Sequence, residues 1–143
     1  MGQSTYGFKD LSVVMAHPAL GQIEINGAGA RSITFTMSND SSHHDLAADG
    51  SVMTSKIAAP NGTVTVVVQQ TSEVHHWFRK LYNYLSAAPL NEWAQITLLA
   101  TGPHMQVTHE GNNMSFQKRA DMPYQAQGGE ISWTFLAGEL IER

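Results

Sequence analysis

Cysteine is absent from this chain of 143 residues, and no long apolar run interrupts its mixture of polar and hydrophobic residues. Without thiols, the chain can form neither a disulfide framework nor a zinc site built on cysteine. No apolar run approaches the roughly 18 residues that predict a membrane-spanning helix. Residues 1–5 also lack the basic and apolar regions of a signal peptide. We therefore expect one domain over residues 1–143, with no contact to a membrane.

Charged residues are also scarce. They make up 14% of the chain, against about 25% in a typical soluble domain. The net charge of -4 argues against tight binding of nucleic acid through its phosphates. Two explanations of the low charge stay open at this point. The chain is either an ordinary β-rich domain with a neutral surface, or a domain whose surface is largely buried against copies of itself.

Signatures of catalysis and of cofactor binding are missing as well. No serine sits in a G-x-S-x-G elbow, and no G-x-x-x-x-G-K-[ST] phosphate loop occurs. The histidines do not have the spacing of metal ligands, because His75 and His76 are adjacent on a predicted helix. His104 and His109 differ by an odd number and so point to opposite faces of a predicted strand. We expect no enzyme, no cofactor and no metal site.

One stretch, at about residues 72–87, predicts a helix. Its apolar residues recur at i, i+3 and i+4 spacing and form a single stripe that requires a partner surface. Ser72 is a candidate N-cap, and Pro89 marks the end. The expected core residues of this helix are Val74, Trp77, Phe78, Leu81 and Leu85.

The rest of the chain is typical of β-strands. Alternating or apolar runs predict strands at residues 11–16, 21–26, 31–38, 51–58, 63–70, 93–101, 104–110, 113–119 and 130–137. Gly111 and Asn112 would form a short hairpin connection. Residues 39–50 are polar and rich in turn formers, which predicts a long loop. The fold class that follows is mostly β: an antiparallel β-sandwich or barrel with one flanking α-helix.

These runs, from YGFKD at Tyr6 through LSVVMAHP, GQIEINGAGARSITFTMSND, HHDLAADGSVMTSKIAAPNGTVTVVVQQTS and EISWTFLAGEL, carry a family likeness. The chain resembles the tail tube proteins of contractile-tailed bacteriophages over nearly its whole length. The resemblance rests on overall pattern, because no catalytic signature exists to test it. Such proteins are structural components of the virion and are not enzymes.

The resemblance implies a specific assembly. Tail tube subunits form hexameric rings, assembled in the host cytoplasm, that stack into a tube. Their inner sheets join around a lumen, through which the genome DNA passes without specific binding. Tail sheath, baseplate and tape-measure proteins are the expected partners. The related injection tubes of bacterial secretion systems share this fold.

Two sets of residues acquire roles from the resemblance. The long loop would contact neighbouring subunits or the next ring, through Asn39, Asp40, Ser41, Ser42, His43, His44, Asp45, Leu46 and Asp49. The polar, mostly uncharged strand faces would line the lumen, through Gln22, Glu24, Ser32, Thr34, Thr36, Gln106, Thr108 and Glu110. Arg31, Lys118 and Arg119 do not fit a lumen that lacks cations.

Two other classes stay open. The chain could be another virion component of similar fold, such as a tail completion or head decoration protein. It could also be a ligand-binding β-sandwich that uses Trp77, Trp93 and Trp133 as platforms. All three tryptophans fall on predicted apolar faces or at element ends, which favours core positions for them.

Overall fold

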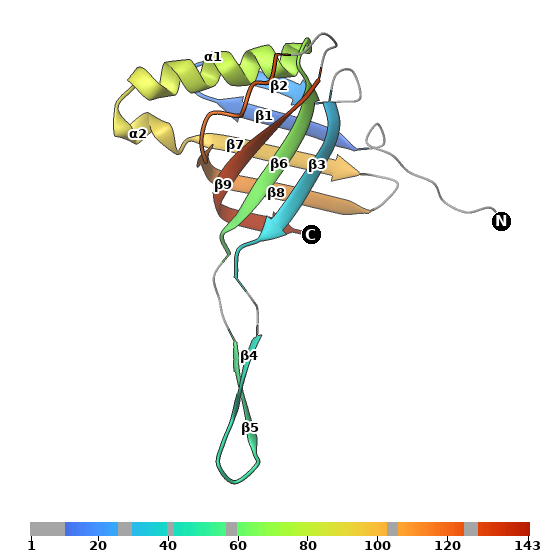
Figure 1. Cartoon of the computed structure of the whole chain (residues 1–143), viewed down its shortest axis with the longest axis vertical. Helices are drawn as coiled ribbons and strands as arrows, with labels where there is room; N and C mark the ends of the chain where they lie inside the picture. Colours follow the sequence, from blue (N-terminus) through green and yellow to red (C-terminus); the bar gives the residue numbers. More distant parts are fainter. Residues whose placement is uncertain (1–10, 26–29, 40–41, 57–59, 103–105, 125–128) are drawn as a thin grey trace, which may run out of the picture.

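A computed structural model describes residues 11–25, 30–39, 42–56, 60–102, 106–124 and 129–143 (Figure 1). The predictions made for Asp40, Ser41 and His104, and for residues 26 and 57–58 at the ends of two predicted strands, lie outside the described residues.

Seven strands form one antiparallel sheet in the order β2-β1-β7-β8-β9-β6-β3. The sheet curls into a half-barrel, and the long helix α1 lies across one of its faces (Figure 1). The strands are β1 (Ser12–His17), β2 (Gly21–Ile25), β3 (Ala30–Met37), β6 (Gly62–Gln69), β7 (Ile96–Gly102), β8 (Val107–Phe116) and β9 (Glu130–Glu142). The helices are α1 (Glu73–Ala87) and the short α2 (Leu90–Trp93). The predicted fold class is confirmed.

Alternation of side chains explains which sheet face is buried. In β6, Val64, Val66 and Val68 are fully buried in the core, while Thr63 and Thr65 between them are half-buried on the other face. β9 alternates in the same way: Ile131, Trp133, Phe135 and Ala137 are buried, while Leu136 between them is 42% exposed. Because strand side chains alternate strictly, each strand contributes one row to the core and one to the opposite surface. We call the sheet face turned away from α1 the outer face.

α1 begins and ends where its sequence signals place it. The Ser72 hydroxyl accepts a hydrogen bond from the backbone N–H of His75 at 3.2 Å, and the helix ends at Ala87, before Pro89. The side chains that α1 buries against the sheet are Val74, His75, Phe78, Leu81 and Leu85. Trp77 lies at the margin of the apolar stripe and is only half-buried, unlike the core position expected for it.

A cluster of aromatic rings holds α1 to the sheet. The ring of Phe78 meets Trp133 and Phe135 edge to face, with centroids 5.8 and 5.2 Å apart. Phe116 and Tyr82 extend this cluster towards α2. Edge-to-face pairs contribute about 0.5–1.5 kcal/mol each beyond their buried area. The packing of α1 on the sheet is therefore specific as well as apolar.

A buried histidine completes this contact. His75 is 2% exposed, and its Nδ1 accepts a hydrogen bond from the indole N–H of Trp133 at 3.1 Å. Burial lowers the pKa of His75 from 6.5, and the charges of Arg79 and His76 lower it further. Protonation would also place a hydrogen on the nitrogen that accepts the indole N–H. The neutral ring is thus the form that fits the fold.

We expect the free subunit to lose stability as the pH falls below about 6.5, the ordinary pKa of histidine. In that range the unfolded chain binds a proton at His75 that the folded chain resists, so the free energy of unfolding falls with pH. Urea unfolding at pH 7.5, 6.5 and 5.5 measures this slope. His75→Gln, which keeps an acceptor and cannot titrate, should flatten it; equal slopes in both proteins would contradict the prediction.

The predicted division of residues 104–119 into two strands is wrong. Gly111 and Asn112 do not form a hairpin connection, because β8 runs through them without a break. Gly111 is buried and pairs with Leu98 on one side and Leu140 on the other. Asn113 has φ 53°, and the register beside it shifts, which identifies a bulge. Turn-forming residues are also the residues of bulges, so composition alone did not separate the two.

α2 and the end of β9 also differ from the expectation. The periodicity did not predict α2, which sits between α1 and β7. His17 of β1 holds α2 in place: its Nε2 donates to the carbonyl of Glu92 at 2.9 Å, while its Nδ1 accepts from the Ala19 N–H.

β9 was predicted to end at Ala137 and instead continues to Glu142.

The predicted loop at residues 39–50 contains a strand. β4 (Ser42–Leu46) pairs antiparallel with β5 (Val52–Lys56) and forms a separate two-stranded sheet. Figure 1 shows this hairpin projecting far from the half-barrel, at the end opposite α1. The expectation of an irregular loop is therefore wrong. The polar composition correctly indicated that this segment is exposed. It did not indicate a strand, because a hairpin that projects into water needs no apolar face. We call residues 42–56 the arm.

Candidate functional site

The outer face of the sheet brings together residues predicted from three separate strands. Antiparallel partners share a face, so the register fixes which side chains lie in one row. One row runs from Glu24 through Val14 and Leu99 to Glu110. The predicted residues that the register places on this face are Gln22, Glu24, Ser32, Thr34, Thr36, Thr108 and Glu110. Gln106 is an exception: it lies in a turn before β8, with φ 53°.

Further polar residues on the outer face were missed by the sequence prediction. Thr63 and Thr65 of β6 lie opposite Thr36 and Thr34, and their partners on β9 include Thr134. The alternation of threonine and valine within TVTVVVQQ could have placed these threonines on the outer face, but the run was used only to predict a strand. The face is consequently broader than predicted, with hydroxyl groups on β3, β6 and β9, and it also carries the exposed apolar side chains of Leu99 and Leu136.

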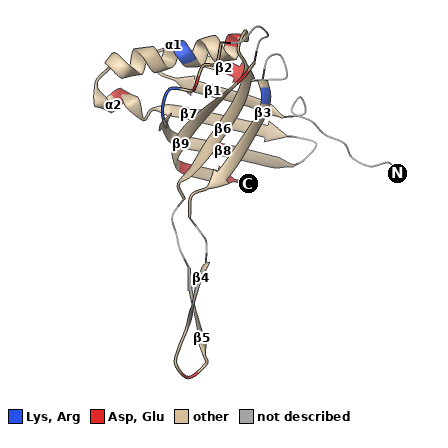
Figure 2. Ribbon diagram, viewed as in Figure 1, with Lys and Arg blue, Asp and Glu red and all other residues tan. Residues whose placement is uncertain are grey.

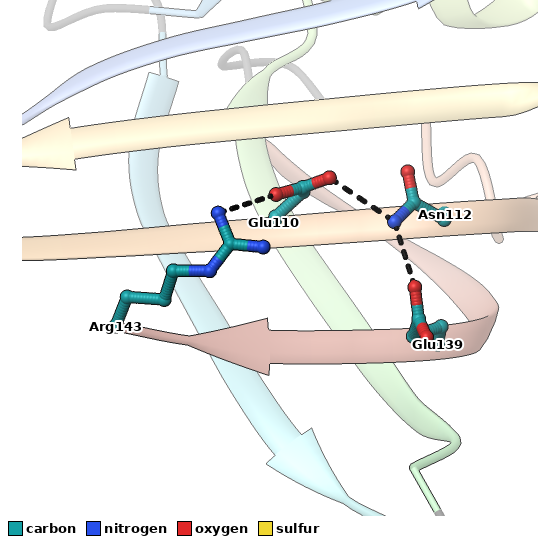
Figure 3. A network of polar contacts seen from close by, with 4 residues as sticks. All are labelled: Glu110, Asn112, Glu139 and Arg143. Carbon is teal, nitrogen blue, oxygen red and sulfur yellow. Dashed lines mark hydrogen bonds and ion pairs between the residues drawn. The ribbon is translucent and has the colours of Figure 1, made fainter.

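A polar network lies where β8 and β9 pair (Figure 3). The Asn112 amide donates to Glu110 Oε1 at 3.2 Å and to Glu139 Oε1 at 3.0 Å. Arg143 Nη1 lies 3.3 Å from Glu110 Oε2. The backbone of Arg143 also exchanges two hydrogen bonds with Thr108. Glu139 and Arg143 were not predicted here because the last strand was expected to end before them, and Asn112 was not predicted because it was assigned to a hairpin connection.

Two of the three cations that did not fit the predicted polar face have side-chain partners, and the third, Lys118, lines a hollow together with Ser132 and Thr134 of the outer face. Arg31 Nε lies 3.2 Å from Glu130 Oε1, in an exposed ion pair. Arg119 turns towards α1, where Nη2 donates to Asn83 Oδ1 at 2.9 Å and the guanidinium lies 5.0 Å from the Tyr82 ring centroid. Figure 2 shows basic residues on α1, on β3 and on the segment that follows β8. Among the described residues, the cations on or beside the outer face therefore include Arg143, which is paired with Glu110, and Lys118.

The sheet is open, and its two outermost strands are β2 and β3. Each pairs on one side only within the described chain. An edge strand offers a row of unpaired N–H and C=O groups to another strand. The outer face thus ends on both sides in backbone that a second chain could extend.

The arm ends in an ordered turn. Ala47 N–H donates to Ser51 O at 2.8 Å, and Gly50 N–H donates to Ala47 O at 3.0 Å. Asp49 Oδ1 accepts from the Ser51 N–H at 3.0 Å and from its hydroxyl at 2.7 Å. The hydroxyl bond is the main reason that the pKa of Asp49 is lowered. Gly50 has φ 91°, which favours glycine.

The tip of the arm exposes apolar side chains. Leu46 is 77% exposed, Val52 57% and Met53 64%. Leu46 and Val52 are cross-strand partners and share one face of the hairpin, whereas Met53 pairs with Asp45 and faces the other way. Of the predicted loop residues, His43 and His44 lie on β4, opposite Ser55 and Thr54, and Asn39 Nδ2 donates to Asn61 Oδ1 at 2.7 Å.

The tryptophans are not arranged as a platform for a ligand. Trp133 is fully buried, and Trp77 and Trp93 are half-buried against the core. In the described residues, no group of three His, Asp or Glu side chains could hold a metal ion. No helix within them has the length and apolar character required to cross a bilayer.

Comparisons with known proteins agree with this geometry. The model of a family described as "Bacteriophage PhiTE tail tube protein" matches residues 3–142. No curated protein sequence matches the chain. A solved structure of similar fold is a chain of the PVC sheath-tube complex, an extracellular contractile injection system in the extended state. Its TM-score is 0.61 at 11% identity, covering 97% of this chain and 91% of that one.

Two other structures of similar fold come from the ends of such tubes. The PVC sheath/tube terminator has a TM-score of 0.61 at 11% identity and covers 99% of this chain and 98% of that one. The tube terminating cap of the anti-feeding prophage has a TM-score of 0.59 at 10% identity, with coverage of 100% and 93%. At such low identity these likenesses concern the fold alone.

Proposed function

The chain belongs to the bacteriophage PhiTE tail tube protein family, and from this premise we propose that it forms hexameric rings that stack into a tail tube. The tube would be the channel through which DNA is ejected into the host. The observation that carries this proposal is the outer face. It is a broad, mainly polar sheet surface, and it ends in two edge strands, β2 and β3, that each pair on one side only within the described chain. Copies joined edge to edge would close such faces around a lumen.

The chemistry of the outer face suits the passage of DNA. Proteins hold DNA mainly through Lys and Arg contacts to phosphates. On this face, Arg143 is paired with Glu110, and Glu24 and Glu139 add negative charge. A lumen lined by hydroxyl, amide and carboxylate groups would let the polyanion slide without being held. Gln22, Ser32, Thr34, Thr36 and Thr108 are the hydroxyl and amide groups assigned to it.

The opposite side of the subunit would then face outwards. It presents α1, whose exposed residues include Arg79 and Lys80. The PVC neighbour was solved as a sheath-tube complex, and we assign this side of our chain to contact with a tail sheath. Baseplate and tape-measure proteins would meet the tube at its end and in its lumen. The assembled chain would be a virion component, put together in the host cytoplasm.

A second candidate function has a specific observation in its favour. The PVC terminator matches this fold with the same TM-score as the PVC sheath-tube chain. A terminator would form one ring at the end of a tube and would not elongate. The fold does not separate the two functions, because both use the same subunit architecture. The family match favours the tube.

Electron microscopy of the purified protein at rising concentration tests the proposal. We expect tubes of uniform diameter, built from stacked rings whose end-on views have six-fold symmetry. Single rings that never elongate would favour the terminator instead. Monomers that remain without rings at high concentration would contradict both assignments. A matched measurement in high salt separates edge-to-edge strand pairing, which salt spares, from contacts between surface charges, which salt screens.

A further inference from the structure

β8 and β9 separate partway along the sheet. The pairing of the two strands reaches Phe116 and Phe135. One further backbone hydrogen bond, from the Gln117 N–H to the Thr134 carbonyl at 2.9 Å, ends the ladder. Residues 118–124 then leave the sheet, and Figure 1 shows them as an orange trace beside the first part of β9. Within the described chain, the first residues of β9 therefore pair with a strand only on the side of β6.

Two residues of β9 direct backbone groups to the side that β8 has left. The carbonyl of Thr134 points to this side, because it accepts from Gln117. Backbone groups of alternate residues in a strand point the same way, so the N–H and C=O of Ser132 and Glu130 point there too. Among the described residues, no backbone hydrogen bond reaches them on this side. Such groups form an edge to which a further strand can pair.

A cavity of about 330 Å³ occupies the place of the missing strand. Its lining includes Gln117, Lys118 and Asp121 on one side and Glu130, Ser132 and Thr134 of β9 on the other. Binding clefts in proteins begin at roughly 300 Å³. The cavity is therefore large enough for a short stretch of chain. We call this cavity between residues 117–123 and β9 the slot.

The wall of the slot opposite β9 is anchored at several points. Ala120 is 6% exposed, and Met122 packs against the core. Arg119 is hydrogen-bonded to α1, and the Pro123 carbonyl accepts from Gln70 Nε2 at 3.1 Å. These contacts hold the wall away from β9. A cavity that exists before its ligand arrives loses little conformational freedom on binding.

The slot has a cation at one end and carboxylates at the other. Residues 117–123 run antiparallel to β9, from Thr134 towards Glu130. Lys118 therefore lies at the Thr134 end, and Asp121 lies at the Glu130 end. An occupant of complementary charge carries an acidic group at the first end and a basic group at the second.

The anionic end keeps its charge despite a neighbouring cation. Glu130 Oε1 lies 3.2 Å from Arg31 Nε, but both side chains are more than half exposed. An ion pair so exposed contributes little, so Glu130 remains available to another cation, and Asp121 adds a second carboxylate. A nucleic acid is a poor occupant, since its phosphates would meet both carboxylates.

We propose that the slot binds an extended segment of another polypeptide as an added strand, antiparallel to β9. The backbone of this segment exchanges hydrogen bonds with Ser132 and Glu130, as in other cases of β-strand addition. Side chains directly opposite each other share a sheet face. The residue opposite Ser132 is acidic because it lies beside Lys118, and the residue opposite Glu130 is basic. In an antiparallel strand the acidic residue comes first, so the recognised pattern is Glu-x-Lys or Asp-x-Arg.

Fluorescence anisotropy with a labelled peptide of blocked ends, Ala-Glu-Ala-Lys-Ala, tests this proposal on the free subunit. The matched control, Ala-Lys-Ala-Glu-Ala, has the same composition in reverse order. We expect the control to bind at least about tenfold more weakly, because its charges meet like charges. A second control carries N-methyl groups on Glu and Lys and should not bind, since it cannot donate hydrogen bonds to β9. Equal binding of either control, or no binding of the first peptide, would overturn the proposal.

Two lysine substitutions separate the slot from the rest of the surface. Lys118→Glu should abolish the preference for the first peptide, because it reverses the charge at the Thr134 end of the slot. Lys80→Glu makes the same change on the exposed side of α1 and should leave the preference unchanged. If both substitutions abolish the preference, or neither does, the peptide does not bind in the slot.

Hydrogen exchange locates the added strand. The Ser132 N–H should exchange at least about tenfold more slowly when the peptide is bound, because a hydrogen-bonded amide is protected. Protection on β2 or β3 instead would show that the peptide pairs with an outer edge of the sheet, which contradicts the proposal. The slot lies within one subunit, so a peptide that fails to bind leaves the proposed tube assembly untouched.

Discussion

Subunits whose arm, residues 42–56, is replaced by a short Gly-Ser linker should fold normally and form no tubes. The arm makes its main contacts within itself, so its removal should change the free energy of unfolding by no more than about 0.5 kcal/mol, as for ordinary surface changes. Assembly should nevertheless be lost, because the family resemblance assigns this segment to contact between copies, and its exposed apolar tip would be gone. Urea unfolding and electron microscopy of the same preparation measure both effects.

A matched control uses an exposed residue outside the arm. Tyr124 is 83% exposed, and Tyr124→Ser should leave both stability and tube formation unchanged. If the protein without its arm still forms long tubes, the arm is not required for assembly. If it fails to fold, the arm belongs to the folding unit of the subunit, and the division between arm and half-barrel is wrong.

Phe78→Ala should destabilise the subunit by about 3–5 kcal/mol, the range for truncation of a buried phenylalanine. Phe78 has no exposed surface and packs edge to face on Trp133 and Phe135. Truncation would remove these ring contacts and leave a cavity between α1 and the sheet. The effect is a large share of a typical domain's total stability of about 5–15 kcal/mol.

Lys80→Ala on the same helix is the control for helix propensity, because Lys80 is exposed and lies two residues after Phe78. We expect this substitution to change the free energy of unfolding by less than about 0.5 kcal/mol. An effect of Phe78→Ala below about 1 kcal/mol would mean that α1 is not held to the sheet by its apolar stripe in solution. Denaturant unfolding of the free subunit, at a concentration too low for assembly, separates these outcomes.

Strict periodicity is what made much of the fold predictable from the sequence. The alternation of valine and threonine in β6 fixed both the strand and its buried face, and the stripe of α1 identified the helix to within a residue or two. The signals that failed were those with two physical meanings. Gly111 and Asn112 suit a turn, but they also suit a strand that bulges at Asn113.

The candidate site was predictable only in part, for a related reason. Polar alternation picked out Thr34 and Glu110 on their own strands, but one sequence does not state which strands are neighbours. The register supplies that information and places both residues on one face. The network of Asn112, Glu139 and Arg143 was out of reach, because it depends on a strand that continues beyond its last clear alternation. The sequence predicted the second strand of the arm, β5, but not β4, because the polar stretch that contains β4 has no buried face to give it a period.

The position of β9 has a consequence for the order of folding. β9 is the last strand in the chain, yet it lies between β8 and β6 and pairs with both. In the sheet, β3 and β6 are joined to the other four strands only through β9. Such long-range pairing slows folding, because loops must close before contacts form. While the protein is being synthesised, β6 and β8 each therefore keep one unpaired edge until β9 has left the ribosome. The outer face becomes continuous only when β9 pairs with both strands.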